Sequence, residues 1–296
     1  MARLEGSMVA IVTPMKDGGV DLRSLRELVE WQVFEGTDGI VPCGTTGEGA
    51  TLTAAERADV IRTVVEQVRG RAVVIAGAGS NATHEAIESV KMAKELRADA
   101  ALVVTPYYNK PTPEGLYRHY TAIWEAARFP VVAYNVPSRT SVDMMPDTVA
   151  RLAKTGAIVG IKEATANMDR KVQLIERVGK DAIAYLSGDD FTVLPYIACG
   201  GHGVISVVGN IAPRAMKELV VAARKGDLAR ALEKQVAMAD LNRMMFVETN
   251  PGPVKAAVAA LGKATGELRL PLAPVSDASL AKVREAMVRF GILKLA

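Results

Sequence analysis

Short apolar runs alternate with helical patterns along most of the chain. The apolar runs are rich in Val, Ile and Ala, and many are continuous rather than alternating, which is typical of parallel strands covered on both faces. They begin about 28 residues apart on average, the spacing of a repeated strand–helix unit. The predicted strands are residues 8–13, 39–41, 72–76, 100–105, 131–134, 158–162, 182–186 and 203–207.

Apolar residues recur at helical spacing in the intervals between these runs. We expect Asp21, Thr53 and Thr83 to be helix N-caps, and only Thr53, with Glu56 three residues later, resembles a capping box. Strand–helix pairs that end near residue 224 predict an α/β fold, a (β/α)8 TIM barrel, with a doubly wound open sheet as the alternative.

The remaining residues have a helical pattern without a Gly/Ser-rich linker before them. We expect helices at 227–247, 253–261 and 276–290. The chain is therefore predicted to comprise a catalytic barrel over residues 1–225 and a C-terminal helical region over residues 226–296 that packs on the barrel.

Composition narrows the class of protein. The net charge is only +3, and no block of Lys and Arg stands out, so nothing favours nucleic acid as a partner. No run approaches the roughly 18 apolar residues of a membrane span, and the first residues lack the apolar core of a signal peptide. Cys43 and Cys199 form no CxxC pair, and the three histidines are scattered. We expect a reduced, cytoplasmic protein without a metal site.

Lys162 stands in the run 157–164, which otherwise has the pattern of a strand buried on both faces. Lysine is rarely buried without a partner, because removing an ammonium group from water is costly. A neutral amine attacks carbonyl groups, so the position favours a Schiff-base lysine. A lysine at the end of the strand that reaches solvent is the alternative.

Other polar residues also follow the predicted strands, where barrel active sites lie. The turn 44–47, Gly-Thr-Thr-Gly, offers backbone N–H groups to a small anion, or is an ordinary turn. Tyr107 and Tyr108 are adjacent and cannot share one face, so at least one is expected in a site or an interface. Arg139 either binds a carboxylate in a bidentate manner or forms a surface salt bridge.

Four motifs, in order, resemble those of the dihydrodipicolinate synthase family. They are Gly-Thr-Thr-Gly-Glu at 44–48, Thr-Pro-Tyr-Tyr-Asn at 105–109, Tyr-Asn-Val-Pro-Ser-Arg-Thr at 134–140 and Gly-Ile-Lys-Glu-Ala at 160–164. The resemblance covers essentially the whole chain. It implies a (β/α)8 barrel with a helical C-terminal region, assembled as a homotetramer, a dimer of dimers. It also implies condensation of pyruvate with L-aspartate 4-semialdehyde in the diaminopimelate route of lysine biosynthesis, without a metal or an organic cofactor.

The resemblance implies roles residue by residue. Lys162 would form the Schiff base with pyruvate, and Thr45, Tyr108 and Tyr134 would transfer protons, with Tyr108 reaching the site of the neighbouring subunit. Thr45 and Thr46 would hold the carboxylate of pyruvate, and Arg139 that of the semialdehyde. The implied substrate-binding residues are Thr45, Thr46, Arg139, Gly188 and Ile205.

Related enzymes of the same superfamily, such as N-acetylneuraminate lyase, share the Schiff-base lysine and are the alternative function. Arg139 favours the synthase, because a short anionic aldehyde requires a charged group near its carboxylate. A catalytically silent barrel retained for binding is the third hypothesis. It predicts loss of Lys162, Tyr134 or Thr45, and all three are present.

The resemblance also implies an effector site for lysine at a subunit interface. Asn81, Glu85 and Tyr107 match that site, whereas Gly49, Ala54 and Arg57 stand where inhibited relatives often carry a serine and two histidines. The fixed positive charge of Arg57 is expected to disfavour a cationic amino acid. The possible effector-site residues are Gly49, Ala50, Ala54, Arg57, Asn81, Glu85 and Tyr107.

Overall fold

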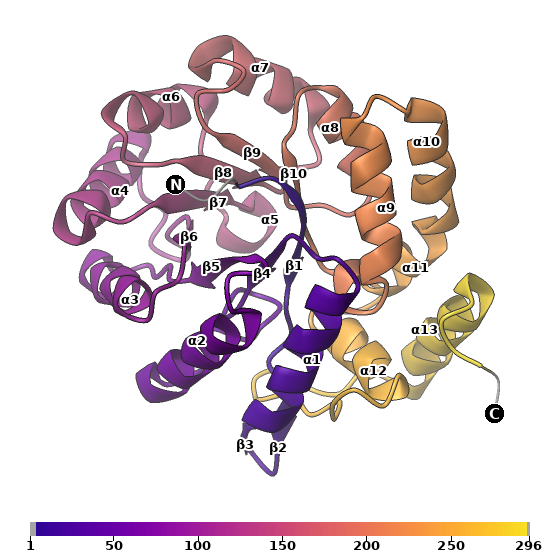
Figure 1. Ribbon diagram of the computed structural model, residues 1–296. Helices are drawn as coiled ribbons and strands as arrows, with labels where there is room; N and C mark the ends of the chain where they lie inside the picture. Colours follow the sequence, from indigo (N-terminus) through magenta and orange to yellow (C-terminus); the bar gives the residue numbers. More distant parts are fainter. Residues whose placement is uncertain (1–3, 295–296) are drawn as a thin grey trace.

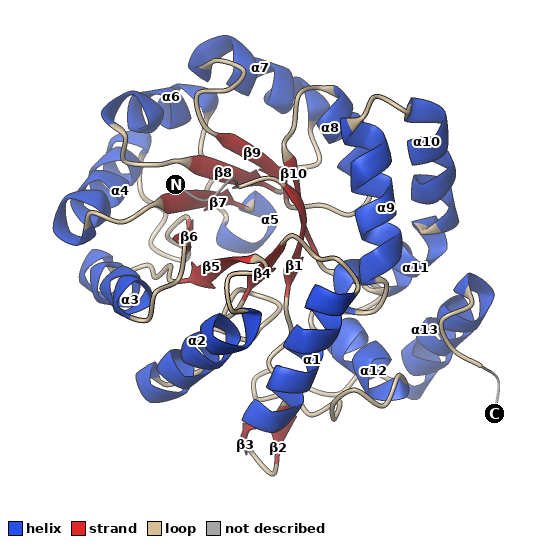
Figure 2. Ribbon diagram, in the orientation of Figure 1, coloured by secondary structure: helices blue, strands red, loops and turns tan. Residues whose placement is uncertain are grey.

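Eight parallel strands form a closed barrel at the centre of the computed structural model, which describes residues 4–294 (Figures 1 and 2). The strand order around the barrel is β1-β10-β9-β8-β7-β6-β5-β4, and β1 pairs with β4 to close it. The predicted (β/α)8 barrel is therefore confirmed. The strands are β1 (Gly6–Ala10), β4 (Gly39–Val41), β5 (Val73–Gly77), β6 (Ala100–Val104), β7 (Val131–Asn135), β8 (Gly160–Glu163), β9 (Ala184–Ser187) and β10 (Gly203–Ser206).

Helices surround the barrel and cover the outward faces of the strands (Figure 1). They are α1 (Leu22–Phe34), α2 (Ala54–Val68), α3 (Thr83–Glu95), α4 (Pro113–Ala127), α6 (Pro146–Thr155), α7 (Met168–Val178), α8 (Val193–Ala198) and α9 (Pro213–Arg224). Two short helices, α5 (Pro137–Thr140) and η1 (Val208–Asn210), follow β7 and β10.

The structure differs locally from the predicted elements. The first strand ends at Ala10 rather than at residue 13, and a small hairpin of β2 (Met15–Lys16) and β3 (Gly19–Val20) follows it. The predicted helix 227–247 is divided into α10 (Leu228–Ala237) and α11 (Ala239–Met244). These differences leave the closed barrel unchanged.

Two of the three predicted helix caps are confirmed. Asp21 accepts hydrogen bonds from the first turn of α1, and Thr53 and Glu56 form a reciprocal capping box at α2. Thr83 is not a cap, because Ala82 occupies that position and makes no side-chain cap bond. The hydroxyl of Thr83 lies 3.0 Å from Nδ1 of His119 instead. A contact between α3 and α4 has taken the place of the local cap.

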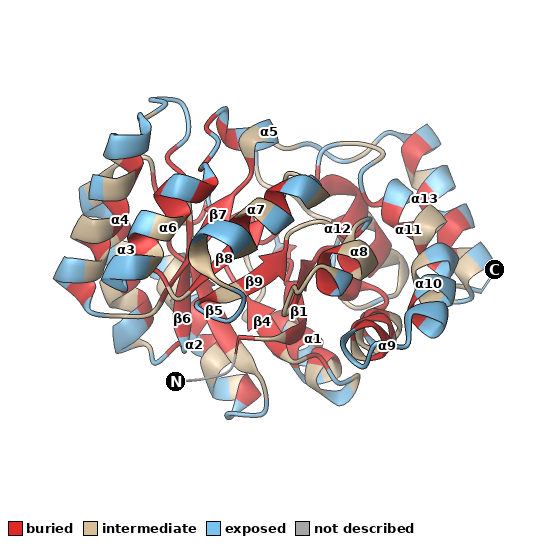
Figure 3. Cartoon of the chain, turned by 90° about the horizontal axis from the view of Figure 1, so that it is seen from above, coloured by how far each residue is buried: buried red, intermediate tan, exposed pale blue. Residues whose placement is uncertain are grey.

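The core has two layers, separated by the barrel wall. The strands of that wall are coloured as buried in Figure 3. Successive side chains on a strand point to opposite faces, so alternate residues enter the interior or lie beneath the helices. On β7, Val132 and Tyr134 belong to the interior cluster, whereas Val131 and Ala133 pack with the helices. The same alternation directs Lys162 inward, because its neighbour Ile161 packs outside.

The C-terminal helices continue the core of the barrel. The helix α12 (Gly252–Ala260) contacts α13 (Asp277–Phe290) and η1, and α10 packs against α9. Val254 and Val283 share one buried cluster with Val9 and Ile40 of the barrel strands. The helices therefore bury apolar surface against the barrel, while the division at residue 225 stays a prediction.

A buried ion pair joins α12 to the barrel. Nζ of Lys255 lies 2.5 Å from Oε1 of Glu48, and both side chains are almost wholly buried. The other oxygen of Glu48 accepts a hydrogen bond from the backbone N–H of Arg269. Removal of one partner from such a pair leaves an uncompensated charge in the interior.

We therefore expect Lys255→Met to lower the free energy of unfolding by about 3–5 kcal/mol, measured by urea denaturation. Lys282→Met, at an exposed position of α13, is the matched control and should change it by less than about 0.5 kcal/mol. The double variant Glu48→Gln/Lys255→Met should recover part of the loss. A cost below about 1 kcal/mol for Lys255→Met would mean that this pair does not hold α12 to the barrel.

Candidate active site

Lys162 lies near the carboxyl end of β8, with only 5% of its surface exposed. The parallel register pairs it with Tyr134 of β7 and Leu186 of β9. Its Nζ lies 4.3 Å from the centroid of the Tyr134 ring, a cation–π geometry. The alternative of a solvent-reaching lysine is wrong, and the amine is held inside the barrel beside a phenol.

Gly188 provides the space that the Lys162 side chain occupies. A Cβ built at Gly188 would lie 2.7 Å from Cβ of Ala164 and 3.0 Å from Cε of Lys162. Its backbone N–H donates to the carbonyl of Glu163 at 2.7 Å, which fixes the loop beside β8. Ile205, fully buried on β10, belongs to the same interior cluster as Tyr134. These two predicted site residues therefore lie in the barrel interior or beside Lys162.

The turn that follows β4 has an unusual backbone. Cys43 and Glu48 adopt positive φ angles, and the N–H of Glu48 donates to the carbonyl of Thr45 at 3.1 Å. Thr45 is exposed, whereas Thr46 is buried and its hydroxyl accepts a hydrogen bond from Nδ2 of Asn250 at 3.1 Å. The turn therefore offers one free hydroxyl to solvent and ties the other to the C-terminal region.

Asn250 is a candidate that the sequence pattern missed. Its backbone carbonyl accepts a 3.4 Å hydrogen bond from Nη2 of Arg139, and its side chain donates to Thr46. Its buried Oδ1 has no hydrogen-bond partner among the described residues. Asn250 thus connects the turn after β4 with the segment that carries Arg139. No local signal could have identified it, because its contacts join segments far apart in the chain.

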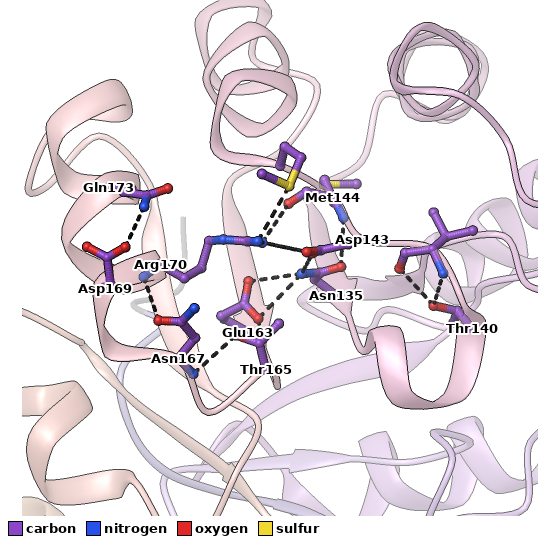
Figure 4. Close-up of polar contacts among 12 residues, drawn as sticks. Asn135, Thr140, Asp143, Met144, Glu163, Thr165, Asn167, Asp169, Arg170 and Gln173 are labelled. Atoms are coloured by element: carbon purple, nitrogen blue, oxygen red, sulfur yellow. Dashed lines mark hydrogen bonds and ion pairs between the residues drawn. The ribbon is translucent and has the colours of Figure 1, made fainter.

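The segment after β7 is held by its own hydrogen bonds (Figure 4). The hydroxyl of Thr140 donates to the carbonyl of Val142 at 3.0 Å and accepts from its N–H at 3.3 Å. Arg139 itself is exposed. Its guanidinium is therefore free to meet a ligand apart from the contact with Asn250.

The adjacent tyrosines after β6 differ in environment. Tyr107 is 38% exposed and Tyr108 is 90% exposed, with a φ of 70°. Tyr108 therefore does not pack within its own chain, and this single chain does not bring its hydroxyl to Lys162.

The residues of the possible effector site are connected mainly through backbone contacts. Nη2 of Arg57 donates to the carbonyl of Gly49 at 2.8 Å, and Nη1 donates to that of Gly77 at 3.1 Å. Ser80 donates to Glu85 at 2.7 Å. A Cβ at Gly49 would lie 2.1 Å from the carbonyl oxygen of Cys43, so no larger residue fits this backbone.

The other residues predicted for the effector site include Ala50, Ala54 and Asn81. Ala50 and Ala54 are exposed, and Asn81 accepts a hydrogen bond at its backbone carbonyl from Asn109 at 2.8 Å. Among the effector-site residues, the guanidinium of Arg57 is held by its hydrogen bonds to the carbonyl groups of Gly49 and Gly77.

Two further lysines are buried. Lys255 is paired with Glu48, and Lys171 of α7 has no hydrogen-bond partner for its Nζ within residues 4–294. The Nζ of Lys171 lies 3.8 Å from the ring centroid of Tyr185, and burial lowers its pKa to about 8. The strand pattern could not reveal Lys171, because it lies on a helix. It is a second candidate nucleophile by burial, but it lies under the helices rather than inside the barrel.

Across the described part of the chain, no group of three His, Cys, Asp or Glu side chains is arranged to hold a metal ion. No helix within residues 4–294 has both the length and the apolar character to cross a membrane.

Fold and site together define a (β/α)8 barrel with a buried lysine amine at the end of a strand. The model of the dihydrodipicolinate synthetase family matches residues 3–289. The chain belongs to this family, whose enzymes are lyases.

The chain is similar to its relatives over nearly its full length. A 4-hydroxy-tetrahydrodipicolinate synthase from Anaeromyxobacter dehalogenans (strain 2CP-C) is 87% identical over 296 residues, which is 100% of both chains. The crystal structure of dihydrodipicolinate synthase from Aquifex aeolicus has a TM-score of 0.96 at 47% identity and covers 98% of this chain and 99% of that one. The chloride-inhibited synthase from Acinetobacter baumannii, complexed with pyruvate, has the same TM-score and identity and covers 98% and 100%.

The close approach of Gly188 to Lys162 generates a prediction. If Lys162 is the Schiff-base lysine, Gly188→Ala should displace its side chain and slow formation of the pyruvate adduct by about tenfold or more, because small misplacements of a reacting group are costly. Gly19→Ala, where the new Cβ would lie 3.7 Å from the nearest atom, is the control and should leave the rate unchanged. The rate is measured by borohydride trapping, and equal rates for both variants would contradict the steric role.

Proposed function

We propose that the chain is a 4-hydroxy-tetrahydrodipicolinate synthase that condenses pyruvate with L-aspartate 4-semialdehyde through a Schiff base on Lys162. The supporting observation is the Lys162 amine, buried inside the barrel, with the ring of Tyr134 4.3 Å away and space cleared by Gly188. Both substrates are carbonyl compounds, and an amine nucleophile can activate a ketone without a metal or an organic cofactor.

The reaction follows from the chemistry of an amine and a ketone. Lys162 adds to the keto carbon of pyruvate, and loss of water gives an iminium ion. The iminium ion withdraws electrons, so the methyl group loses a proton and an enamine forms. The enamine carbon attacks the aldehyde of the second substrate, whose amine then displaces Lys162 and closes the ring. Each step moves a proton, and Tyr134, Thr45 and Tyr108 are proposed to carry it.

Substrate binding divides between the two ends of the site. Thr45 and Thr46 hold the carboxylate of pyruvate through the turn after β4, and Arg139 binds the carboxylate of the semialdehyde. A hydrogen bond to a charged group contributes about 1.5–3 kcal/mol, enough to select an anionic aldehyde. Gly188 and Ile205 complete the wall. The exposed guanidinium of Arg139 also supports the synthase over N-acetylneuraminate lyase, the alternative in the same superfamily.

The covalent step distinguishes two buried amines. With borohydride and pyruvate, mass mapping should find a reduced pyruvyl group on Lys162 and none on Lys171, whose pKa is lowered but which lies outside the barrel. Lys162→Ala should abolish turnover, and Lys171→Met, which replaces an amine over the Tyr185 ring by an apolar chain, should retain it. An adduct on Lys171 in the unmodified protein would overturn the proposal.

Assembly completes the proposed site. We propose a homotetramer built as a dimer of dimers, in which the exposed Tyr108 enters the site of the adjoining subunit. The 90% exposure of this aromatic ring supports the assignment, because a large apolar side chain gains from burial in an interface. The cytoplasm is the proposed location, and no nucleic acid or membrane partner is proposed.

A complementation experiment tests the shared site. Tyr108→Phe subunits and Lys162→Ala subunits should each have little activity, since one lacks a proton-transfer group and the other the nucleophile. After mixing and subunit exchange, turnover should rise at least about tenfold above the Tyr108→Phe background, because a mixed dimer contains one complete site. Failure of recovery in dimers verified by native mass spectrometry would mean that Tyr108 acts within its own subunit or not at all.

Regulation by lysine is proposed to be weak. Two hydrogen bonds from Arg57 to backbone carbonyls hold its permanent charge within the group of effector-site residues, close to Gly49. A lysine ligand carries two ammonium groups and would be repelled. We expect less than about twofold inhibition of initial rate by 1 mM L-lysine, and stronger inhibition of Arg57→His. Half-maximal inhibition well below 1 mM in the unchanged protein would refute this expectation.

A further inference from the structure

The strands β7 and β8, which carry Tyr134 and Lys162, are also linked by a side-chain hydrogen bond on their outer face. The residues that follow them, Asn135 and Glu163, are also partners in the parallel register. Side chains alternate along a strand, so the catalytic pair points into the barrel and the next pair points outward. Both outer residues are almost fully buried, at 0% and 3% exposure. The outer pair therefore lies directly behind the inner pair.

Asn135 uses all of its polar groups (Figure 4). Its Nδ2 donates to Oε2 of Glu163 at 3.1 Å and to Oδ1 of Asp143 at 2.9 Å, and its Oδ1 accepts from the N–H of Met144 at 2.9 Å. The N–H of Met144 can only donate, so it fixes which end of the amide faces each partner. Neither aspartate nor leucine could satisfy the same three partners.

Charged groups hold the far side of this network. Arg170 forms two hydrogen bonds to Asp143, of 2.8 and 2.7 Å, and Oε1 of Glu163 accepts from the N–H of Thr165 at 2.9 Å. Hydrogen bonding to Arg170 lowers the pKa of Asp143, while burial raises the pKa of Glu163. The amide of Asn135 thus bridges two carboxyl groups whose pKa values are shifted in opposite directions. The network also connects the ends of β7 and β8 to the loops that follow them.

We propose that Asn135, together with Glu163, is a positioning pair for the reaction, which sets the Tyr134 phenol against the Lys162 amine by locking the two strand ends in register. Neither residue touches the substrate. The inference rests on the proposed function, in which Lys162 carries pyruvate and Tyr134 moves the proton of its methyl group. A displacement of about 1 Å between such groups can cost about 100-fold in rate.

The test exchanges the donor and the acceptor. Asn135→Asp puts a carboxylate against Glu163, and Glu163→Gln puts an amide against the amide of Asn135. The double variant Asn135→Asp/Glu163→Gln restores one donor and one acceptor across the strands and keeps the net charge. For each protein, borohydride trapping counts the Lys162 sites that react with pyruvate. Exchange of the pyruvate methyl protons in D2O, followed by NMR, gives the proton-transfer rate per trapped site.

We expect each single variant to lower exchange per trapped site by about 10- to 100-fold, and the double variant to recover at least about threefold over Asn135→Asp. Asn242→Ala is the control. Asn242 is also fully buried and donates to the carbonyl of Asp190 at 3.1 Å, but on α11. It should lower the melting temperature and leave exchange per trapped site unchanged, because a merely structural loss reduces the number of sites rather than their rate.

Normal exchange per trapped site in the single variants overturns the positioning role. Recovery in the double variant supports it, and this recovery is partial because the new carboxylate at position 135 still faces Asp143. If Asn135→Asp does not fold, Glu163→Gln, which keeps the shape of the side chain, decides the question alone. If the unchanged protein traps no pyruvate on Lys162, the proposed function itself fails, which is distinct from normal trapping with unaffected variants.

Discussion

The parallel pairing of β7 with β8 is the constraint on which the rest of the site depends. In this register, Tyr134 lies opposite Lys162 and Asn135 lies opposite Glu163. Strand alternation then separates the Tyr134–Lys162 pair inside the barrel from a hydrogen-bonded pair outside it. A shift of one residue in one strand would turn that strand's side chains to the opposite face. At this point of the fold, the backbone register therefore decides which side chains meet inside the barrel.

Burial of charge recurs throughout the molecule, and the three buried amines have two kinds of partner. Lys255 has a carboxylate partner in Glu48, whereas Lys171 lies against the ring of Tyr185 and Lys162 against that of Tyr134. Burial lowers the pKa of Lys255, and its ion pair with Glu48 opposes that shift. An aromatic face gives weaker compensation for lost water than a carboxylate does. Among these three, Lys162 is the one inside the barrel.

The C-terminal helices contribute to the site as well as to the core. Asn250 binds Thr46 and Arg139, and Lys255 binds Glu48, so segments on both sides of the barrel mouth depend on this region. The turn after β4 has little apolar surface of its own to hold its positive φ angles. Contacts from the C-terminal region stabilise it, through Asn250, Lys255 and the backbone N–H of Arg269.

Local pattern determined much of this protein. Apolar runs at βα spacing predicted the barrel, and a lysine in a buried run, with polar residues after neighbouring strands, predicted the candidate site. Strand alternation and the strand–helix repeat are both patterns of short range along the chain. Only the tertiary structure revealed Asn250, which binds Thr46 across 204 residues of sequence, and the exchange of the Thr83 cap for a contact with His119. Contacts between distant segments leave no periodic signal in the sequence. They depend on how the helices and strands pack against one another, and that packing is determined by the whole chain.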